Sequence, residues 1–202
     1  MKKRQSPTRR VTKEVNIKGK LVLDGTGKSK INTGLESLNH MLELFSFHGS
    51  FDLELLAKGD LTHHIVEDIG IALGAAFNKA LGSAISIQRY GESSVPMDEV
   101  LARVSIDISG RPYFRLGKPT GLVLPNIEES MDLKSSDFET FLKAFVEHAK
   151  ITMHIDTSYS TAIDTHHYFE AVFKAIAVAL KKAIQIDKAR KGIPSTKGVI
   201  DL

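Results

Sequence analysis

Two copies of one histidine-rich motif are the residues of this sequence whose types and spacing could do chemistry. Each copy has two adjacent histidines and, after two further residues, a glutamate: His63, His64 and Glu67, then His166, His167 and Glu170. On a helix, residues three or four apart share a face, whereas adjacent residues diverge by about 100°. One histidine of each pair can therefore join its glutamate on a metal ion, and the other serves a second metal or another partner.

The available donor atoms limit which metal such a site would take. The chain has eight histidines and no cysteine, so the ligands would be nitrogen and oxygen. That set suits Mn, Fe, Zn, Ni or Co, and a six-coordinate preference favours Mn or Fe. His40 and His154 are expected in corresponding parts of two halves of the chain, which gives three histidines and one glutamate per metal. His148 matches nothing else and is assigned no ligand role.

A single motif of this kind has a simpler explanation, because the negative charge of a glutamate in the first turn interacts favourably with the helix dipole and stabilises the helix. Two copies at matched places favour the metal site.

A second group of residues is typical of anion binding, because arginine forks and Ser/Lys pairs donate hydrogen bonds to phosphate. Its members are Arg89, Arg111, Lys174, Ser195 and Lys197. No glycine-rich nucleotide-binding motif is present, so a small phosphorylated substrate is expected rather than a nucleotide.

Hydrophobic periodicity indicates the elements that must position these residues. The first half is predicted to contain an extended segment over 11–23, a hairpin-type turn at 24–27, further extended chain to about 33, a helix over 35–47, a strand near 51–55 and a helix over about 63–82. A short extended piece over 84–90 leads into a break at 93–96. The second half is predicted to contain strands over 99–108 and 111–117, a helix over 138–150, a strand over 151–156 and a helix over about 166–186.

The two halves also resemble each other in sequence. The 19-residue segments that begin at His63 and His166 share seven identical positions, including both histidines and the glutamate. Helix propensity alone does not require a shared His-His-x-x-Glu start, so we predict an internal duplication. Residues 1–94 form the first half, 95–190 the second, each reading strand-strand-helix-strand-helix, and 191–202 form a tail that contributes to the active site of one compact catalytic domain.

Composition excludes several classes of protein. The 202 residues are 42% hydrophobic and 25% charged, as in ordinary globular proteins, and no apolar run is long enough to span a membrane. The basic start has no apolar segment behind it, so it is not expected to be a secretory signal. The absence of cysteine fits a reducing compartment, and we predict a cytoplasmic location. The net charge is +3, which is weak support for nucleic-acid binding.

Together, these motifs resemble those of the imidazoleglycerol-phosphate dehydratase family, which belongs to histidine biosynthesis. The similar stretches span almost the whole chain. They are Thr12-Lys13-Glu14, Leu38–Leu42, Phe47-His48, Gly59-Asp60-Leu61, HHIVEDIGIALG from His63, Arg89-Tyr90-Gly91, PMDEVLARVSIDISGRPY from Pro96, His154-Ile155, HHYFEAVFKA from His166 and Ser195–Gly198.

Two loops depart from the family pattern. The family often has several more residues, including aspartates, between Gly-Asp-Leu and the first histidine pair, whereas here Leu61 and Thr62 lead straight into His63. Before the second pair the family commonly shows Gly-x-Asn, where this chain has Ala162–Thr165 in a slightly longer loop. The geometry of these loops is therefore expected to differ, although no ligand is missing.

The resemblance implies an α+β fold whose helices pack between two four-stranded sheets, assembled as a 24-subunit cage built from trimers. It implies two Mn²⁺ ions per site at subunit contacts. The residues that match metal ligands are His40, His63, His64, Glu67, His154, His166, His167 and Glu170. Those that match the phosphate grip are Arg89, Arg111, Lys174, Ser195 and Lys197, and His48 matches a residue that lines the substrate pocket.

The implied reaction is the Mn-dependent removal of water from imidazole glycerol phosphate to give imidazole acetol phosphate. The proton that is lost is on a carbon with no adjacent carbonyl, so metal Lewis acidity acting on the imidazole ring would replace enolate chemistry. The candidate catalytic carboxylates are Glu14, Glu170 and Asp98. Glu14 would contact the glycerol hydroxyls or relay the proton, and Asp98 would orient a ligand.

Three other functions fit part of the pattern. A dinuclear hydrolase would use the same ligands and hold a phosphoester. A metal-storage or metal-dependent assembly protein would use the ligands but gives no reason for Arg89, Arg111 and the Ser195–Gly198 tail. Nucleic-acid binding would rest on the basic residues of the first ten positions alone.

Overall fold

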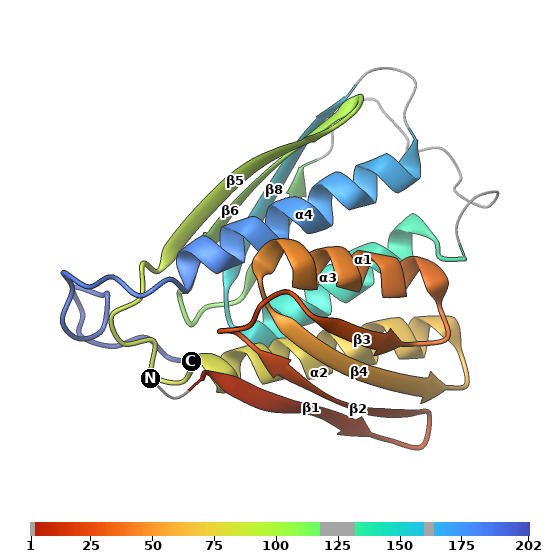
Figure 1. Ribbon diagram of the computed structural model, residues 1–202, viewed down its shortest axis with the longest axis horizontal. Coiled ribbons are helices and arrows are strands. Elements are labelled where there is room, and N and C mark those ends of the chain that lie inside the picture. The colour runs from red at the N-terminus through yellow and green to blue at the C-terminus, as the bar shows by residue number, and fades with distance from the viewer. Residues whose placement is uncertain (1–2, 118–131, 160–163) are drawn as a thin grey trace.

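The computed structural model describes residues 3–117, 132–159 and 164–202. These residues form two four-stranded sheets with four helices between them (Figure 1). The predicted α+β fold, with helices packed between two four-stranded sheets, is confirmed. Within the same residues, no helix combines the length and the apolar character that crossing a membrane requires.

The two sheets have the same strand order and the same pairing directions. The first has the order β1-β2-β4-β3, from β1 (Gln5–Val11), β2 (Val15–Val22), β3 (Ser29–Asn32) and β4 (Asp52–Gly59). The second has the order β5-β6-β8-β7, from β5 (Tyr90–Met97), β6 (Val100–Asp107), β7 (Tyr113–Gly117) and β8 (Thr152–Tyr159). In each sheet only the strand before the connecting helix pairs in parallel. The shared topology supports the predicted duplication.

The helices occupy equivalent places in the two halves. The first half contains α1 (Glu36–Gly49) and α2 (Thr62–Leu81), and the second contains α3 (Ser135–Ala149) and α4 (Thr165–Ala183). In the layer between the sheets, α2 packs on α3 and α1 packs on α4 (Figure 1). Each helix that carries a histidine pair therefore packs against a helix of the other half.

One strand at the start of each half was not predicted from the sequence. The inward positions of β1 include Ser6 and Thr8, and those of β5 include Gly91, so the aliphatic alternation that marks a strand is missing. Short side chains are required there because a Cβ on Gly91 would lie 2.0 Å from the Ala179 carbonyl oxygen of α4. The predicted boundary at 94/95 falls inside β5, and the division into halves and tail stays a prediction.

Two groups of predicted site residues lie at opposite ends of the second sheet. Arg89 directly precedes β5, and Asp98 and Glu99 form the two-residue turn that joins Met97 of β5 to Val100 of β6. Eight extended residues span about 26 Å, so Arg89 and this turn lie at opposite ends of the strand. The N-termini of α2 and α4 lie at the same end as the turn (Figure 1).

Candidate metal centre and phosphate-binding residues

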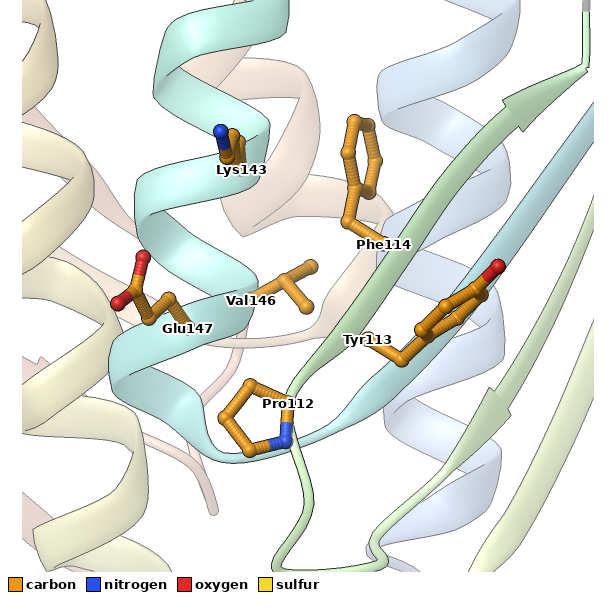
Figure 2. Close-up of a pocket in the computed structure, with 6 residues that line it drawn as sticks. All are labelled: Pro112, Tyr113, Phe114, Lys143, Val146 and Glu147. Atoms are coloured by element: carbon orange, nitrogen blue, oxygen red, sulfur yellow. The ribbon is translucent and has the colours of Figure 1, made fainter.

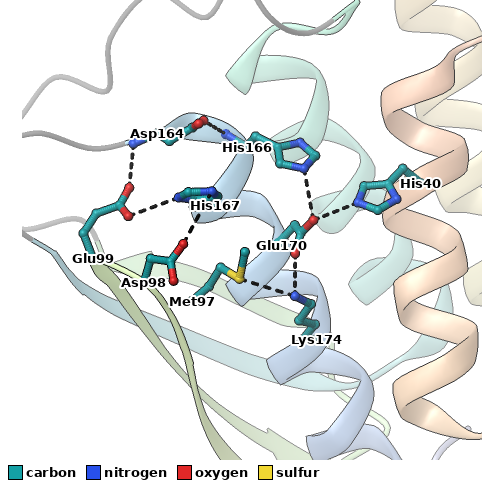
Figure 3. A network of polar contacts seen from close by, with 9 residues as sticks. All are labelled: His40, Met97, Asp98, Glu99, Asp164, His166, His167, Glu170 and Lys174. Atoms are coloured by element: carbon teal, nitrogen blue, oxygen red, sulfur yellow. Dashed lines mark hydrogen bonds and ion pairs between the residues drawn. The ribbon is translucent and has the colours of Figure 1, made fainter.

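A compact cluster of two histidines and one glutamate lies between α1 and α4 (Figure 3). Nε2 of His40 on α1 is 2.8 Å from Oε1 of Glu170, and Nε2 of His166 is 3.0 Å from the same oxygen. The two imidazole rings stack with centroids 5.2 Å apart. His166 thus shares a helix face with Glu170, as the helical spacing predicts, and the three side chains present donors that could hold one metal ion.

Lys174 and His48 set the charge around this cluster. Burial would raise the pKa of Glu170, but hydrogen bonds from Lys174 and His40 outweigh it and lower this pKa to about 2. Lys174 also contacts Sδ of Met97 at 3.5 Å. Burial and the nearby Lys174 lower the pKa of His48. These contacts therefore favour the ionised form of Glu170, whereas burial favours the neutral form of His48.

The second histidine of this pair points to different residues. Nδ1 of His167 is 3.1 Å from Oε2 of Glu99, and its Nε2 is 3.8 Å from Oδ2 of Asp98. The hydrogen bond with Glu99 raises the pKa of His167. The structure thus places the second histidine against the β5–β6 turn and the first against Glu170, in agreement with the predicted divergence of adjacent histidines.

The first histidine pair has a different environment at the start of α2. Nδ1 of His64 is 2.8 Å from Oδ1 of Asp60 and 3.9 Å from Oε2 of Glu14. The hydrogen bond with Asp60 raises the pKa of His64. His63 and Glu67 are exposed, and among the described residues neither belongs to a group of three converging ligand atoms.

His154 does not occupy the place that corresponds to His40. His40 lies on α1, whereas His154 lies on β8, where its ring is 5.4 Å from that of Tyr113. The two histidines therefore lie on neighbouring but not equivalent elements of the two halves, since β8 has the same place in its sheet as β4, the strand that follows α1. His154 alternates with the buried Met153 and Ile155 and so belongs to the outer face of the second sheet.

Arg89 forms a bidentate ion pair with Asp107, so its guanidinium group already has a partner within the chain. Its Nε is 2.7 Å from Oδ1 of Asp107, its Nη2 donates to Oδ2, and its Nη1 donates to the Pro194 carbonyl oxygen at 2.9 Å. The hydrogen bonds with Asp107 raise the pKa of Arg89. This arginine thereby fixes the tail beside the start of β5, and Ser195 follows directly.

Arg111 and the tail meet at the same end of the sheet. Gly110, which precedes Arg111, packs against the backbone of Asp201 and has a φ of 72°, a conformation that favours glycine. In the tail, Oγ of Ser195 accepts a hydrogen bond from the Lys197 amide. Arg89, Arg111, Ser195 and Lys197 are therefore associated with one end of the second sheet. Lys174, predicted as the fifth member, lies instead beside Glu170.

A cavity of about 390 Å³ lies close to Arg111, between α3 and β7 (Figure 2). Its walls are Pro112, Tyr113, Phe114, Lys143, Val146 and Glu147. None of the predicted ligands or phosphate-binding residues lines it. The cavity is therefore not where the predicted site residues converge.

Comparison with known proteins identifies the family. Residues 33–180 match the family model described as imidazoleglycerol-phosphate dehydratase. The chain belongs to the imidazoleglycerol-phosphate dehydratase family. Among curated members of this family, the protein of Syntrophobacter fumaroxidans is 44% identical over 98% of both chains. That of Pseudomonas fluorescens is 45% identical over 99% of this chain and 100% of its own.

Solved structures of imidazoleglycerol-phosphate dehydratases share the fold. The Staphylococcus aureus enzyme matches with a TM-score of 0.75 and 36% identity over 90% of this chain and 99% of its own. The Pyrococcus furiosus enzyme matches with a TM-score of 0.79 and 34% identity over 95% and 99%. Membership of the imidazoleglycerol-phosphate dehydratase family makes the chain a hydro-lyase of histidine biosynthesis with a phosphorylated imidazole substrate.

Three carboxylates with clear contacts were not predicted as site residues of this imidazoleglycerol-phosphate dehydratase chain. Asp60 holds His64, Glu99 holds His167, and Asp107 holds Arg89. All three were part of the stretches that resemble the family, but no role was derived for them. Their partners come from folding contacts that spacing along the chain does not show.

Proposed function

We propose that this chain catalyses the Mn-dependent dehydration of imidazole glycerol phosphate to imidazole acetol phosphate. The convergence of His40, His166 and Glu170 from two different helices carries this proposal. Two imidazole nitrogens and an ionised carboxylate, with no cysteine anywhere in the chain, fit a manganese ion. When bound, Mn²⁺ would supply Lewis acidity to the imidazole ring of the substrate.

Residues of this chain would bind the metal, contact the substrate hydroxyls, orient a ligand and hold the phosphate. The predicted metal ligands would be His40, His63, His64, Glu67, His154, His166, His167 and Glu170. Glu14, within 3.9 Å of His64, is placed to contact the glycerol hydroxyls or to relay a proton. Asp98 would orient His167, and His48 would line the substrate pocket beside Glu170. Arg89, Arg111, Ser195 and Lys197 would hold the phosphate and so orient the reacting carbons, and Lys174 would complete this grip from its place beside Glu170.

The phosphate is expected to bind to a different subunit from the metal cluster. In one chain, Arg89 and the Asp98-Glu99 turn are separated by the full length of β5, about 26 Å. A substrate made of one imidazole ring, a three-carbon chain and a phosphate is much shorter than this. A complete site would therefore combine the metal end of one subunit with the phosphate end of another, which supports the 24-subunit assembly of trimers that we propose.

Mn dependence is tested by turnover of imidazole glycerol phosphate before and after chelation, with Mn²⁺ added back. We expect activity to disappear on chelation and to return with Mn²⁺. Turnover of generic phosphoesters, with none of the imidazole substrate, would instead support a hydrolase.

The shared site is tested by mixing two inactive variants, Arg111→Ala and His167→Ala, in one assembly. If each site uses residues of two subunits, some sites of the mixture receive both wild-type ends, and part of the activity returns. Sites confined to one subunit would leave every mixture inactive. Light scattering, with and without chelator, would measure whether metal removal converts the cage into trimers. The cytoplasmic location stays a prediction.

A further inference from the structure

Both histidine pairs share a feature that the ligand pattern does not require. In each pair the second histidine has its Nδ1 held by a carboxylate: His64 by Asp60 at 2.8 Å and His167 by Glu99 at 3.1 Å. The carboxylates come from different places. Asp60 lies four residues before His64 in the same segment, whereas Glu99 comes from the β5–β6 turn (Figure 3).

The direction of these hydrogen bonds fixes the proton on each ring. Asp60 and Glu99 each place a carboxylate oxygen within hydrogen-bond distance of Nδ1, and carboxyl groups are ordinarily ionised at neutral pH. An ionised carboxylate can only accept hydrogen bonds, so Nδ1 of each histidine carries the proton. In a neutral imidazole the other nitrogen, Nε2, then has the free lone pair, which is the form that coordinates a metal.

We propose that Asp60 and Glu99 are positioning residues that hold His64 and His167 with the proton on Nδ1, so that Nε2 is presented to metal. This inference rests on the proposed metal role of these histidines. A carboxylate behind a ligating histidine fixes the ring orientation and increases the basicity of the donor nitrogen. The two halves thus place a carboxylate behind the equivalent histidine by two different routes.

Glu99 has a second contact that locks its geometry. Its Oε1 accepts from the Asp164 amide at 2.7 Å, and Asp164 in turn caps α4 by accepting from the His166 amide at 2.7 Å. Each oxygen of Glu99 is therefore committed to one donor. A glutamine at this position offers one acceptor oxygen for two donors, so Glu99→Gln must lose one of the two contacts.

The first test is the tautomer of each histidine in the metal-free full chain, labelled with ¹⁵N-histidine at pH 9 and measured by long-range proton–nitrogen correlation. His64→Asn and His167→Asn identify the two signals. We expect the Nδ1–H tautomer at both positions, a loss of it at His167 alone in Glu99→Leu, and a loss of it at His64 alone in Asp60→Leu, because leucine offers no acceptor to Nδ1. Glu92→Gln, an exposed residue of β5, is the matched control.

The second readout is Mn²⁺ affinity by competition with a chelator. Each positioning variant is expected to bind the same number of ions about 10- to 100-fold more weakly, and the two aspartate/glutamate exchanges, Asp60→Glu and Glu99→Asp, are expected to recover part of that loss. An unchanged tautomer in Glu99→Leu and Asp60→Leu, or unchanged affinity, would overturn the inference. Failure of the wild-type chain to bind Mn²⁺ would instead refute the proposed function, and the tautomers would still decide the role of the carboxylates.

Discussion

The helices α2 and α4 carry the same motif but bury it differently. On α4, His166 and Glu170 are joined by His40 of α1, and Glu170 keeps only 11% of its side chain exposed. On α2, His63 and Glu67 are exposed. The neighbouring helices explain the difference. From the ends of α1 and α3 through the strands that follow them, equivalent residues of the two halves differ by 100 in number. The residue of α3 that is equivalent to His40 is therefore Thr140.

The packing of the two helices differs as well. Gly70 and Gly74 let α3 approach α2 closely, because a Cβ on them would lie 2.6 and 2.4 Å from carbonyl oxygens of α3. The aligned residues of α4 are Phe173 and Ala177, and the Phe173 ring stacks on Phe141 of α3 at 5.7 Å. The two helices thus keep the same histidine and glutamate positions on different packing surfaces. On α4 the glutamate contacts His40 and His166 within the chain, whereas on α2 His63 and Glu67 are exposed.

The largest expected effect tests whether both helices contribute to metal binding. His64→Ala and His167→Ala should each abolish activity and weaken Mn²⁺ binding by at least about 100-fold, because each removes a predicted ligand. Elemental analysis of the purified variants measures the metal content. Full occupancy in either variant would remove that helix from the metal site.

The second prediction concerns stability without metal. Glu170→Ala should lower the free energy of unfolding of the metal-free chain by about 3–5 kcal/mol, because it leaves Lys174 without its buried partner. Glu67→Ala should change it by less than about 0.5 kcal/mol, since Glu67 is exposed. Denaturant unfolding with chelator present compares the two. Equal losses would mean that the two glutamates have similar environments.

The third prediction tests the different helix packing. Gly74→Ala should destabilise the protein by about 1–3 kcal/mol, because the added methyl group meets backbone of α3. The reverse exchange at the aligned position, Ala177→Gly, should cost about 1 kcal/mol, mainly in helix propensity. Thermal unfolding of both variants measures the difference. A neutral Gly74→Ala would show that α2 and α3 can separate at little cost.

The smallest effect concerns pH in the metal-free chain. The pKa values of His64 and His167 lie above 6.5, raised by Asp60 and Glu99, and that of His48 lies below 6.5. The raised pKa values of His64 and His167 stabilise the folded state below pH 6.5. This stabilisation is lost as the pH rises through the pKa values that the two histidines have in the folded state. Histidine titration by NMR checks the three directions. Asp60→Asn should bring His64 back toward 6.5 and leave His167 unchanged.

Much of the fold could be predicted from periodicity. The helices over 35–47, 63–82, 138–150 and 166–186 correspond to α1 to α4, because each has a continuous apolar face. The strands β1 and β5 could not be predicted, since Ser6, Thr8 and Gly91 stand where aliphatic residues would mark the inner face, and at Gly91 the α4 backbone leaves no room for a side chain. The sequence pattern therefore fails where packing is closest.

Prediction of the site was limited by contacts between elements. The spacing correctly predicted that His166 shares a face with Glu170 and that His167 diverges from it. It could not reveal Glu99 behind His167 or Asp107 behind Arg89, because the pairing of β5 with β6 brings both carboxylates into place. It also could not show that Arg89 and the Asp98-Glu99 turn, each beside predicted site residues, lie at opposite ends of β5.

The two carboxylate–histidine contacts have consequences for how this sequence can change in length. Asp60 directly follows Gly59, the last residue of β4, and lies in the same segment as His64. Insertions ahead of Asp60 would leave the spacing of this pair unchanged, whereas insertions between Asp60 and His63 would alter it. Glu99 reaches His167 from another element, through a turn of only two residues. An insertion in that turn would move the carboxylate away from the imidazole.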